Sequence, residues 1–401
     1  MSLVRDPMRP APDPARLARI QRRFGEFATE YAALPLYSTI SSHVARDEET
    51  ASLLLAARSG QARPVLWLAA LHDLVLRQPD TPAAQWYPSV GDLSVPDGDP
   101  WPDVRRTVLD HADELVRLIA THGTQTNEVN RAAYVSIGLA AAADDRREVP
   151  MTLVELGASA GLLLGVDRYA VELTSATGTV HLGDPGSPVH CSTLDRADVR
   201  GLLVARGGGI PPVRGRVGLD VEPVDLDDDD AVRWLEACLW PDVPGRIERF
   251  RAARDLLRTD PPLVLRGDMV DGLEDAVGRT RAIGGDDAHV VVLSSWALTY
   301  LPAARRHDLS SALSALSTEV PDLSWVTAEP PGCVPGVPVP RGPVDGGTVV
   351  GLRRWRRGRE LAATALGTCH PHGTWIDLTL PERDPAEGNP HARGPRAEPC
   401  T

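Results

Sequence analysis

The spacing of hydrophobic residues divides the chain into two regions. Before residue 122, apolar side chains recur every three or four positions, which is the period of an amphipathic helix. The first run begins at Asp13-Pro14, an N-cap followed by proline at the first helical position. It continues through Leu17, Ile20, Phe24, Phe27 and Tyr31. Further helical runs cover 48–58, 64–77 and 102–122, and no strand is expected among them. The sequence therefore predicts a helical domain over 13–145.

After residue 150 the pattern changes to short apolar runs, which are typical of buried parallel strands. Five runs alternate with helical segments and two more close the region as an antiparallel pair: 152–156, 216–221, 262–266, 290–294, 323–328, 348–355 and 374–380. Strands that alternate with helices favour an α/β fold. We expect a Rossmann-like sheet of about seven strands, the last antiparallel, over 150–380. The polar tail over 381–401 is expected to be disordered.

The stretch 152–169, TLVELGASAGLLLGVDRY, has the order strand, small-residue turn and helix found in nucleotide-binding βαβ units. Gly157 suits a turn with positive φ, and Gly161 allows the helix to begin close to the strand. Free N–H groups at that helix start would attract polar or anionic ligand groups. The residues between the glycines are short enough for a ligand to approach the backbone: Ala158, Ser159 and Ala160. The alternative is a tight turn that binds nothing.

Together with Glu155, near the carboxyl end of the strand, this turn resembles the first motif of class I S-adenosylmethionine-dependent methyltransferases. Ser159 stands where that motif usually has its middle glycine. The resemblance implies a methyltransferase-type sheet and S-adenosylmethionine bound over 157–161, with Glu155 supporting the turn. The other cofactor-binding candidates stand at or after the ends of later strands: Asp220 or Glu222 for the ribose, Asp268 near the adenine, and Ser294.

A polar cluster at 124–134 precedes an apolar helical run. One interpretation is structural: Thr126 or Asn127 caps the helix, and Asn127 contacts Arg131 within it. The other is a pocket, because Asn127, Arg131 and Tyr134 have the spacing i, i+4 and i+7 of one helix face. In that case Glu128 would act as a base or bind a cationic acceptor, and Arg131 would clamp an acceptor anion. The remaining substrate-binding candidates are Gln125, Thr126, Asn127 and Tyr134.

Composition and charge narrow the possible functions. The chain has 42 Lys+Arg against 55 Asp+Glu, a formal net charge of −13, which disfavours broad binding to nucleic acid or anionic membranes. Every basic residue is arginine, so catalytic lysines and the P-loop lysine are excluded. The cysteines lack CxxC spacing, and no metal site is predicted, including at Cys369, His370 and His372. We expect a cytoplasmic protein that acts on a small molecule, with its oligomeric state open.

The chain also resembles, over roughly residues 15 to 380, an uncharacterised bacterial family called domain of unknown function 2332, common in actinobacteria. The stretches that carry this resemblance are 125–129 with Arg131, 155–169, Trp240-Pro241-Asp242, Gly267-Asp268 and His372-Gly373. The resemblance implies a methyltransferase-like sheet and marks the polar cluster at 125–131 as a family hallmark. Two functions remain open: methylation of a small polar molecule on oxygen or nitrogen, or ligand binding without catalysis.

Overall fold

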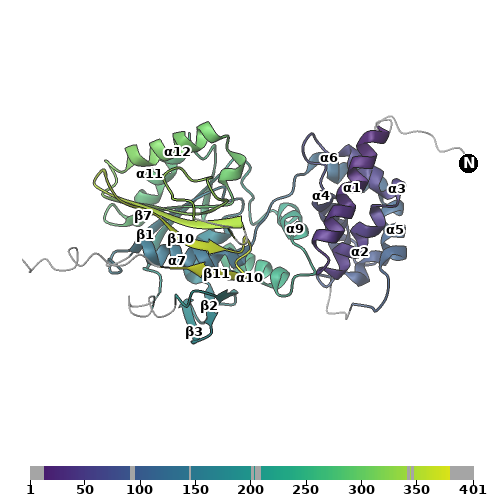
Figure 1. Ribbon diagram of the computed structural model, residues 1–401, viewed down its shortest axis with the longest axis horizontal. Coiled ribbons are helices and arrows are strands. Elements are labelled where there is room, and N and C mark those ends of the chain that lie inside the picture. Colours follow the sequence, from purple (N-terminus) through teal and green to yellow (C-terminus); the bar gives the residue numbers. More distant parts are fainter. Residues whose placement is uncertain are drawn as a thin grey trace, which may run out of the picture. The chain divides into compact units, whose positions relative to one another are not determined.

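The computed structural model describes residues 13–90, 95–143, 146–199, 203, 209–340, 344 and 347–379, and the tail expected over 381–401 lies outside them. The chain forms two compact units (Figure 1). The helical unit runs to Glu128 and includes Val224–Arg258, whereas the sheet unit contains Val129–Pro223 and the chain from Thr259 onward. The helical unit is thus assembled from two separate segments of sequence.

The helical unit contains eight described α-helices and two 3₁₀ helices. They are α1 (Pro14–Glu30), α2 (Pro35–Val44), α3 (Glu48–Ala51), η1 (Ser52–Ala56), α4 (Pro64–Arg77), η2 (Pro82–Trp86), α5 (Trp101–Asp110), α6 (Ala112–Thr121), α9 (Asp229–Ala237) and α10 (Arg246–Arg258). Within the described part of 13–122 there is no strand, as predicted. The single helix expected over 102–122 is wrong, because the chain leaves helical geometry at His111, where φ is −116° and ψ is 22°.

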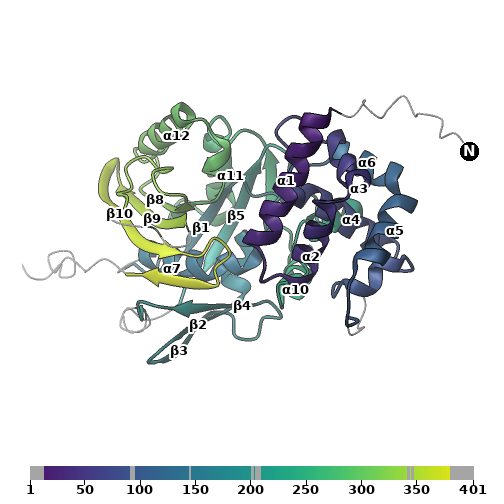
Figure 2. The ribbon, with the colours of Figure 1, turned by 45° about the vertical axis from the view of Figure 1, so that its right-hand side comes forward.

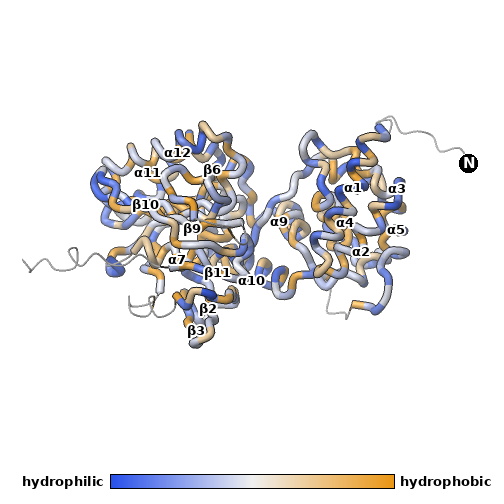
Figure 3. Tube along the Cα trace, in the orientation of Figure 1, coloured by the Kyte–Doolittle hydropathy of each residue, from blue (hydrophilic) through white to orange (hydrophobic). Residues whose placement is uncertain are grey.

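A side-chain cap begins α1, and aromatic packing joins α1 to α4. Asp13 caps α1 as predicted, since its Oδ1 accepts from the backbone N–H groups of Ala15 at 3.0 Å and Arg16 at 3.2 Å. α1 alternates between apolar and polar positions, while α4 is apolar along most of its length (Figure 3). Phe24 of α1 packs edge-on against Trp67 of α4, with the ring centroids 5.9 Å apart. α4 is therefore the central helix of this core.

The sheet unit is a mixed α/β structure with eleven described strands, so the prediction of about seven was wrong. The strand order is β3-β2-β4-β11-β10-β9-β8-β7-β1-β5-β6. The strands are β1 (Met151–Leu156), β2 (Ala170–Ser175), β3 (Gly178–Gly183), β4 (His190–Asp195), β5 (Val213–Asp220), β6 (Leu263–Arg266), β7 (His289–Ser295), β8 (Asp322–Glu329), β9 (Thr348–Arg356), β10 (Arg359–Cys369) and β11 (Trp375–Leu378).

The additional strands have two origins. β10 follows β9 as an antiparallel hairpin, and β11 pairs with β10 rather than with β9. The strand pattern of β10 is weak, because its sequence RELAATALGTC is rich in alanine and contains glycine, which are poor strand formers. β2, β3 and β4 form between the first and second strands of the predicted sheet, and β2 and β3 pair as an antiparallel hairpin.

Five strands form a parallel core in the order β6-β5-β1-β7-β8. Numbered along the chain within this core, the order is 3-2-1-4-5, which is the order of a classic doubly-wound sheet. β9 then adds antiparallel to β8. In such sheets, ligands bind outside the carboxyl ends of the strands, where the order reverses beside the first strand.

Helices cover both faces of this core (Figure 2). On one face, α11 (Leu273–Gly284) and α12 (Ala303–Leu316) pack against residues such as Val154 and Trp325. On the other face lies α7 (Ala132–Ala143), where Gly138 approaches Val326 so closely that an added Cβ would lie 2.4 Å from its Cγ1. Since neighbouring residues of a strand point to opposite faces, Trp325 faces the layer of α11 and α12, whereas Val326 faces α7.

Candidate functional site

The turn after β1 is held by its own neighbours. Gly157, Ser159 and Gly161 have φ of 72°, 51° and 72°. The N–H groups of Gly157 and Ala158 both donate to the Leu219 carbonyl, at 2.8 and 3.3 Å. The N–H of Ser159 donates to Asp220 Oδ2 at 2.8 Å. These three N–H groups of the turn are therefore already engaged by the end of β5.

The segment after the turn is also different from the prediction. η4 (Leu162–Arg168) is a 3₁₀ helix and not the start of a longer helix. Gly161 must be glycine for a packing reason, because an added Cβ would lie 2.9 Å from Pro262 Cγ, and its φ is positive. At Gly157 an added Cβ would lie 2.8 Å from the Cβ of Ala297. Replacing Gly157 would thus disturb packing, so it cannot serve as a clean test of ligand binding.

Asp220 ends β5, beside the turn, as the strand order requires. Besides accepting from Ser159, it accepts from the N–H of Glu222 through Oδ1 at 2.8 Å. Glu222 itself is exposed. Of the two ribose candidates, Asp220 is the one that the fold brings to the turn. Both of its oxygens contact backbone N–H groups, so its observed role is to order the β1 turn.

Asp268 lies after β6 in a tight turn. Its Oδ1 accepts from the N–H groups of Val270 at 2.8 Å and Asp271 at 3.3 Å, and from Arg305 Nη2 at 2.8 Å. Partial burial raises the pKa of Asp268, but these N–H groups and the Arg305 guanidinium outweigh it, so the pKa lies below its ordinary value. The observed contacts are those of a capping carboxylate paired with α12.

Glu155 behaves in the opposite way. It is 6% exposed, and within the described chain no residue forms a hydrogen bond or an ion pair with its carboxyl, whose Oε2 is fully buried. It therefore does not bond to the turn that it was expected to support. Burial raises the pKa of Glu155 to about 8; the positive charge of Arg131 opposes this rise and Asp220 adds to it. A buried carboxyl without a partner is costly and calls for an explanation.

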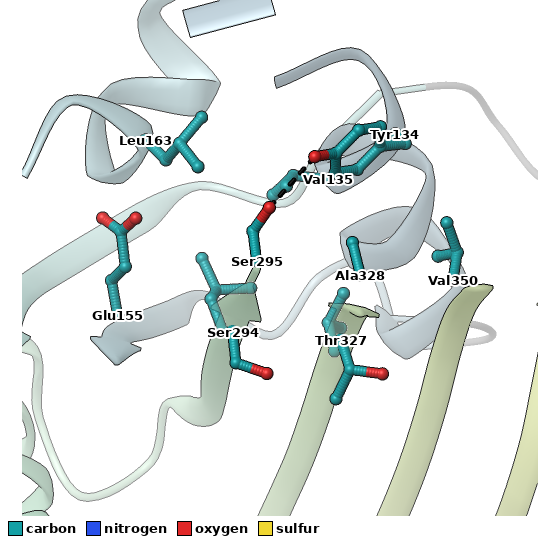
Figure 4. Close-up of a pocket in the computed structure, with 11 residues that line it drawn as sticks. Tyr134, Val135, Glu155, Leu163, Ser294, Ser295, Thr327, Ala328 and Val350 are labelled. Atoms are coloured by element: carbon teal, nitrogen blue, oxygen red, sulfur yellow. Dashed lines mark hydrogen bonds between the residues drawn. The ribbon is translucent and has the colours of Figure 1, made fainter. Parts of the chain in front are cut away.

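A small cavity adjoins Glu155 (Figure 4). Its enclosed volume of about 10 Å³ has room for about one water molecule. In Figure 4 the carboxyl of Glu155 lies opposite Leu163, and the hydroxyl of Ser295 contacts that of Tyr134 at 3.0 Å. The lining residues come from α7, η4 and four strands: Tyr134, Val135, Glu155, Leu163, Leu293, Ser294, Ser295, Val326, Thr327, Ala328 and Val350. The cofactor candidate Ser294 is therefore on the cavity wall.

Arg131 crosses the strand ends near this cavity. It is 6% exposed, and it donates from Nε to the Pro371 carbonyl and from Nη1 to the Ser295 carbonyl, both at 3.1 Å. Tyr134 also reaches the Pro371 carbonyl, at 3.4 Å. Arg131 and Tyr134 thus contact the same two residues, Pro371 and Ser295. Asn127 does not share their helix face, because α7 begins at Ala132 and only the 3₁₀ turn η3 (Val129–Arg131) precedes it.

Glu329 is a second buried carboxyl near Arg131, and the sequence analysis did not single it out. Its Oε1 accepts from the N–H groups of Ala297 at 3.0 Å and Leu298 at 3.2 Å, which fixes the loop after β7. Burial raises the pKa of Glu329 to about 7, while those N–H groups and the charge of Arg131 oppose the rise. Arg131 therefore acts electrostatically on two buried carboxyls, Glu155 and Glu329. Glu329 stands directly after the predicted strand 323–328, and this place at a strand end could have marked it as a candidate.

Asn130 is a second residue that sequence reasoning missed. Its Nδ2 lies within 3.0–3.2 Å of the carbonyls of Ser192, His372 and Gly373, and its Oδ1 accepts from the Ser192 N–H at 2.9 Å. Gly373 fits closely, since an added Cβ would lie 2.4 Å from the Asn130 carbonyl oxygen. Asn130 thus connects the start of α7 to β4 and to the loop before β11.

The rest of the polar cluster belongs to the helical unit. Glu128 is 4% exposed, and its Oε2 lies 2.7 Å from Nε of Arg246, which is 5% exposed. Gln125 lines a polar cleft of that unit together with Asp73, Arg77 and Trp234. Thr126 is exposed and Asn127 is buried. The unit boundary falls between Glu128 and Val129, so the cluster at 125–134 contributes to two different units.

Metal-binding clusters and membrane-spanning helices are both absent from the described residues. No group of three or more His, Cys, Asp and Glu side chains there is arranged to hold a metal ion. No helix in that part of the chain has the length and apolar character needed to cross a membrane. His72 is an ordinary buried histidine, bonded to the Ser89 hydroxyl at 2.6 Å, and burial lowers its pKa to about 4.

Comparison with known proteins identifies the family. No curated protein matches the chain. Residues 21–378 match a family described as an uncharacterized protein conserved in bacteria, DUF2332. This match spans both units and includes Glu155, Arg131 and Asn130. The chain therefore belongs to the DUF2332 family.

Proposed function

We propose that this protein is an S-adenosylmethionine-dependent methyltransferase that acts on a small polar molecule. The observation that carries the proposal is the buried carboxyl of Glu155, which has no partner within the described chain and lies at the carboxyl end of β1. The order 3-2-1-4-5 of the parallel strands supports a ligand site at this edge. An antiparallel strand after the fifth parallel strand is also a feature that the methyltransferase resemblance implied.

The Glu155 carboxyl suits a cationic cofactor. S-adenosylmethionine carries a sulfonium and an ammonium group, and it supplies an electrophilic methyl group when bound. A carboxyl with no internal partner is suited to a positive group, because ion pairing would offset its burial. In this proposal Glu155 binds the cofactor and Asp220 keeps the β1 turn in the shape that admits it. The enclosed cavity has room for only about one water, so only a charged group of S-adenosylmethionine, and not the whole cofactor, would reach Glu155.

The acceptor is proposed to be small and polar, methylated on oxygen or nitrogen. Methyl transfer needs in-line positioning of the acceptor and, for some acceptors, a base. Arg131 and Tyr134 contribute polar groups to the cavity region. Glu128 is less suited to act as a base than the sequence indicated, because it is buried and its Oε2 already lies 2.7 Å from Arg246 Nε.

A second function has its own support. The N–H groups of the β1 turn are bonded to Leu219 and Asp220, and Ser159 replaces the usual glycine. These features favour a protein that has kept the fold and binds a ligand without catalysis. Both functions require a ligand at Glu155, so they differ only in turnover.

Thermal melting with added ligand tests the shared requirement. S-adenosylmethionine should raise the melting temperature and NAD should not, since a ligand that binds only the folded state stabilises it. Glu155→Gln should remove the shift, while Glu222→Gln, an exposed carboxylate near the same edge, should retain it. No shift for the wild type would refute both functions. Mass spectrometry of small-molecule extracts incubated with the protein and cofactor then separates them, because only the methyltransferase yields a methylated product.

A further inference from the structure

A cleft of about 620 Å³ in the helical unit is lined by five arginines, independently of the site at Glu155. Arg16, Arg19 and Arg23 extend from α1, and Arg58 and Arg63 come from the segment that joins η1 to α4. Among the described residues that line this cleft there is no carboxylate. We call it the arginine cleft. In a chain with 55 acidic and 42 basic residues, such a concentration of one charge is unexpected.

The five guanidinium groups have no counter-ion within the described chain. None of the five forms an ion pair there. Arg22, on the same helix but outside the cleft, pairs with Glu26 at 3.4 Å. Like charges that line one cleft repel one another. An anion bound between them would relieve this repulsion.

Two of the arginines are already oriented. Arg16 Nη2 donates to the Ala57 carbonyl at 3.0 Å, and Arg23 Nη1 donates to the Ala62 carbonyl at 2.8 Å. Each keeps further N–H groups for another acceptor, since a guanidinium has five. Arg19, Arg58 and Arg63 are exposed and complete the set. Arginine forks match the oxygens of phosphate groups in bidentate geometry.

We infer that the arginine cleft binds a small molecule that carries several linked phosphates. Several charges in one cleft favour a polyphosphate chain over a single carboxylate. A nucleic acid is disfavoured, because the whole chain is acidic and no aromatic side chain lines the cleft for base stacking. Free polyphosphate and a nucleoside triphosphate share this chemistry, so the test compares both.

Calorimetric titration of the full chain tests this inference. The probes are inorganic tripolyphosphate, ATP and a single-stranded oligonucleotide, at constant ionic strength. We expect tripolyphosphate to bind, and Arg19→Gln with Arg63→Gln to weaken it at least tenfold. Arg22→Gln is the matched control and should bind like the wild type. Tighter binding of ATP would identify the nucleotide as the source of the phosphates.

Three results would overturn the inference. One is the absence of heat with tripolyphosphate and ATP alike. Another is equal loss of binding in the Arg22→Gln control, which would show only a general effect of charge. The third is tighter binding of the oligonucleotide than of tripolyphosphate, which would indicate a nucleic-acid surface. Since Arg19 and Arg63 are exposed, their variants should melt like the wild type without ligand.

Discussion

Two buried glutamates, one in each unit, have opposite surroundings. Glu128 of the helical unit is 4% exposed and lies 2.7 Å from the Arg246 guanidinium. Glu155 of the sheet unit is 6% exposed, and its carboxyl has neither a hydrogen bond nor an ion pair within the described chain. Both residues were candidates for the site, and the sequence alone could not separate them. The structure distinguishes them, because Glu128 has an arginine partner and the carboxyl of Glu155 has none within the described chain.

The difference is between a charge that the fold pairs and a carboxyl that the fold leaves available for the proposed ligand. A buried carboxylate that is matched by an arginine stabilises the fold as long as both partners are present. A buried carboxyl without a partner makes no such contribution and shifts its pKa instead, as Glu155 does. Strongly shifted groups concentrate at functional sites. The comparison therefore assigns Glu128 to structure and makes Glu155 the residue on which the proposed ligand site depends.

The largest expected effect is that of Glu128→Gln. Removing this charge leaves Arg246 buried without its carboxylate, which should lower the free energy of unfolding by about 3–5 kcal/mol. Chemical denaturation followed by circular dichroism measures the loss. The double variant Glu128→Gln/Arg246→Gln should recover part of it, because the nearest cation is removed with the carboxylate and only the more distant Arg249, 3.9 Å from Glu128 Oε1, then lacks its partner. A single variant as stable as the wild type would remove the contrast between the two glutamates.

The same substitution at Glu155 should act in the opposite direction. The folded-state pKa of about 8 lies above the ordinary value of 4.5, so the wild type loses stability as pH rises from 4.5 to 8. By pH 7 this loss is about 3 kcal/mol. Gln does not titrate, so the stability of Glu155→Gln relative to the wild type should increase over this range. A difference that does not change with pH would indicate that Glu155 has an ordinary pKa.

Arg131→Gln sharpens the comparison inside the sheet unit. Loss of the bonds to the Pro371 and Ser295 carbonyls should cost about 2 kcal/mol. Because the charge of Arg131 lowers the pKa of Glu155, its removal should move that pKa above about 8. The measurement is the pH dependence of stability of this variant, with and without Glu155→Gln. If the pH range stays the same, the two side chains are not coupled.

The smallest effect is expected for Asp220→Asn. The amide keeps one acceptor oxygen and loses the other, so one of the bonds from Ser159 and Glu222 is weakened, at about 1 kcal/mol. Thermal melting measures it, with Glu222→Gln as the control. S-adenosylmethionine should bind this variant more weakly, since the β1 turn is less ordered. A change in stability equal to that of Glu128→Gln would mean that Asp220 has a greater role in the core.

Local patterns in the sequence were sufficient for part of the fold. The cap at Asp13 and the five parallel strands depend on neighbouring residues, and the structure confirms both. β10 was missed because its alanines and glycine do not resemble a strand until β9 and β11 pair with it. The strand count therefore depended on long-range pairing.

The site could be predicted only as far as the strand ends. Glu155 and Asp220 follow from their places at the ends of β1 and β5. The roles of Asn130 and Glu329 depend on partners far away or across the sheet, such as Ser192 at 62 positions from Asn130. The prediction that Asn127 and Arg131 share a helix face was wrong, because it assumed one regular helix, whereas the backbone from 122 to 131 is not α-helical.

The most direct test of the account is the titration of the Glu155 carboxyl itself. Infrared difference spectra of the wild type minus Glu155→Gln isolate its C=O stretch from that of Glu329. The account predicts a protonated acid whose midpoint lies near pH 8, and a lower midpoint when S-adenosylmethionine is added, because a cation stabilises the carboxylate. A midpoint near 4.5 without ligand would show that Glu155 is matched or hydrated in solution, and would contradict the claim that it marks a ligand site.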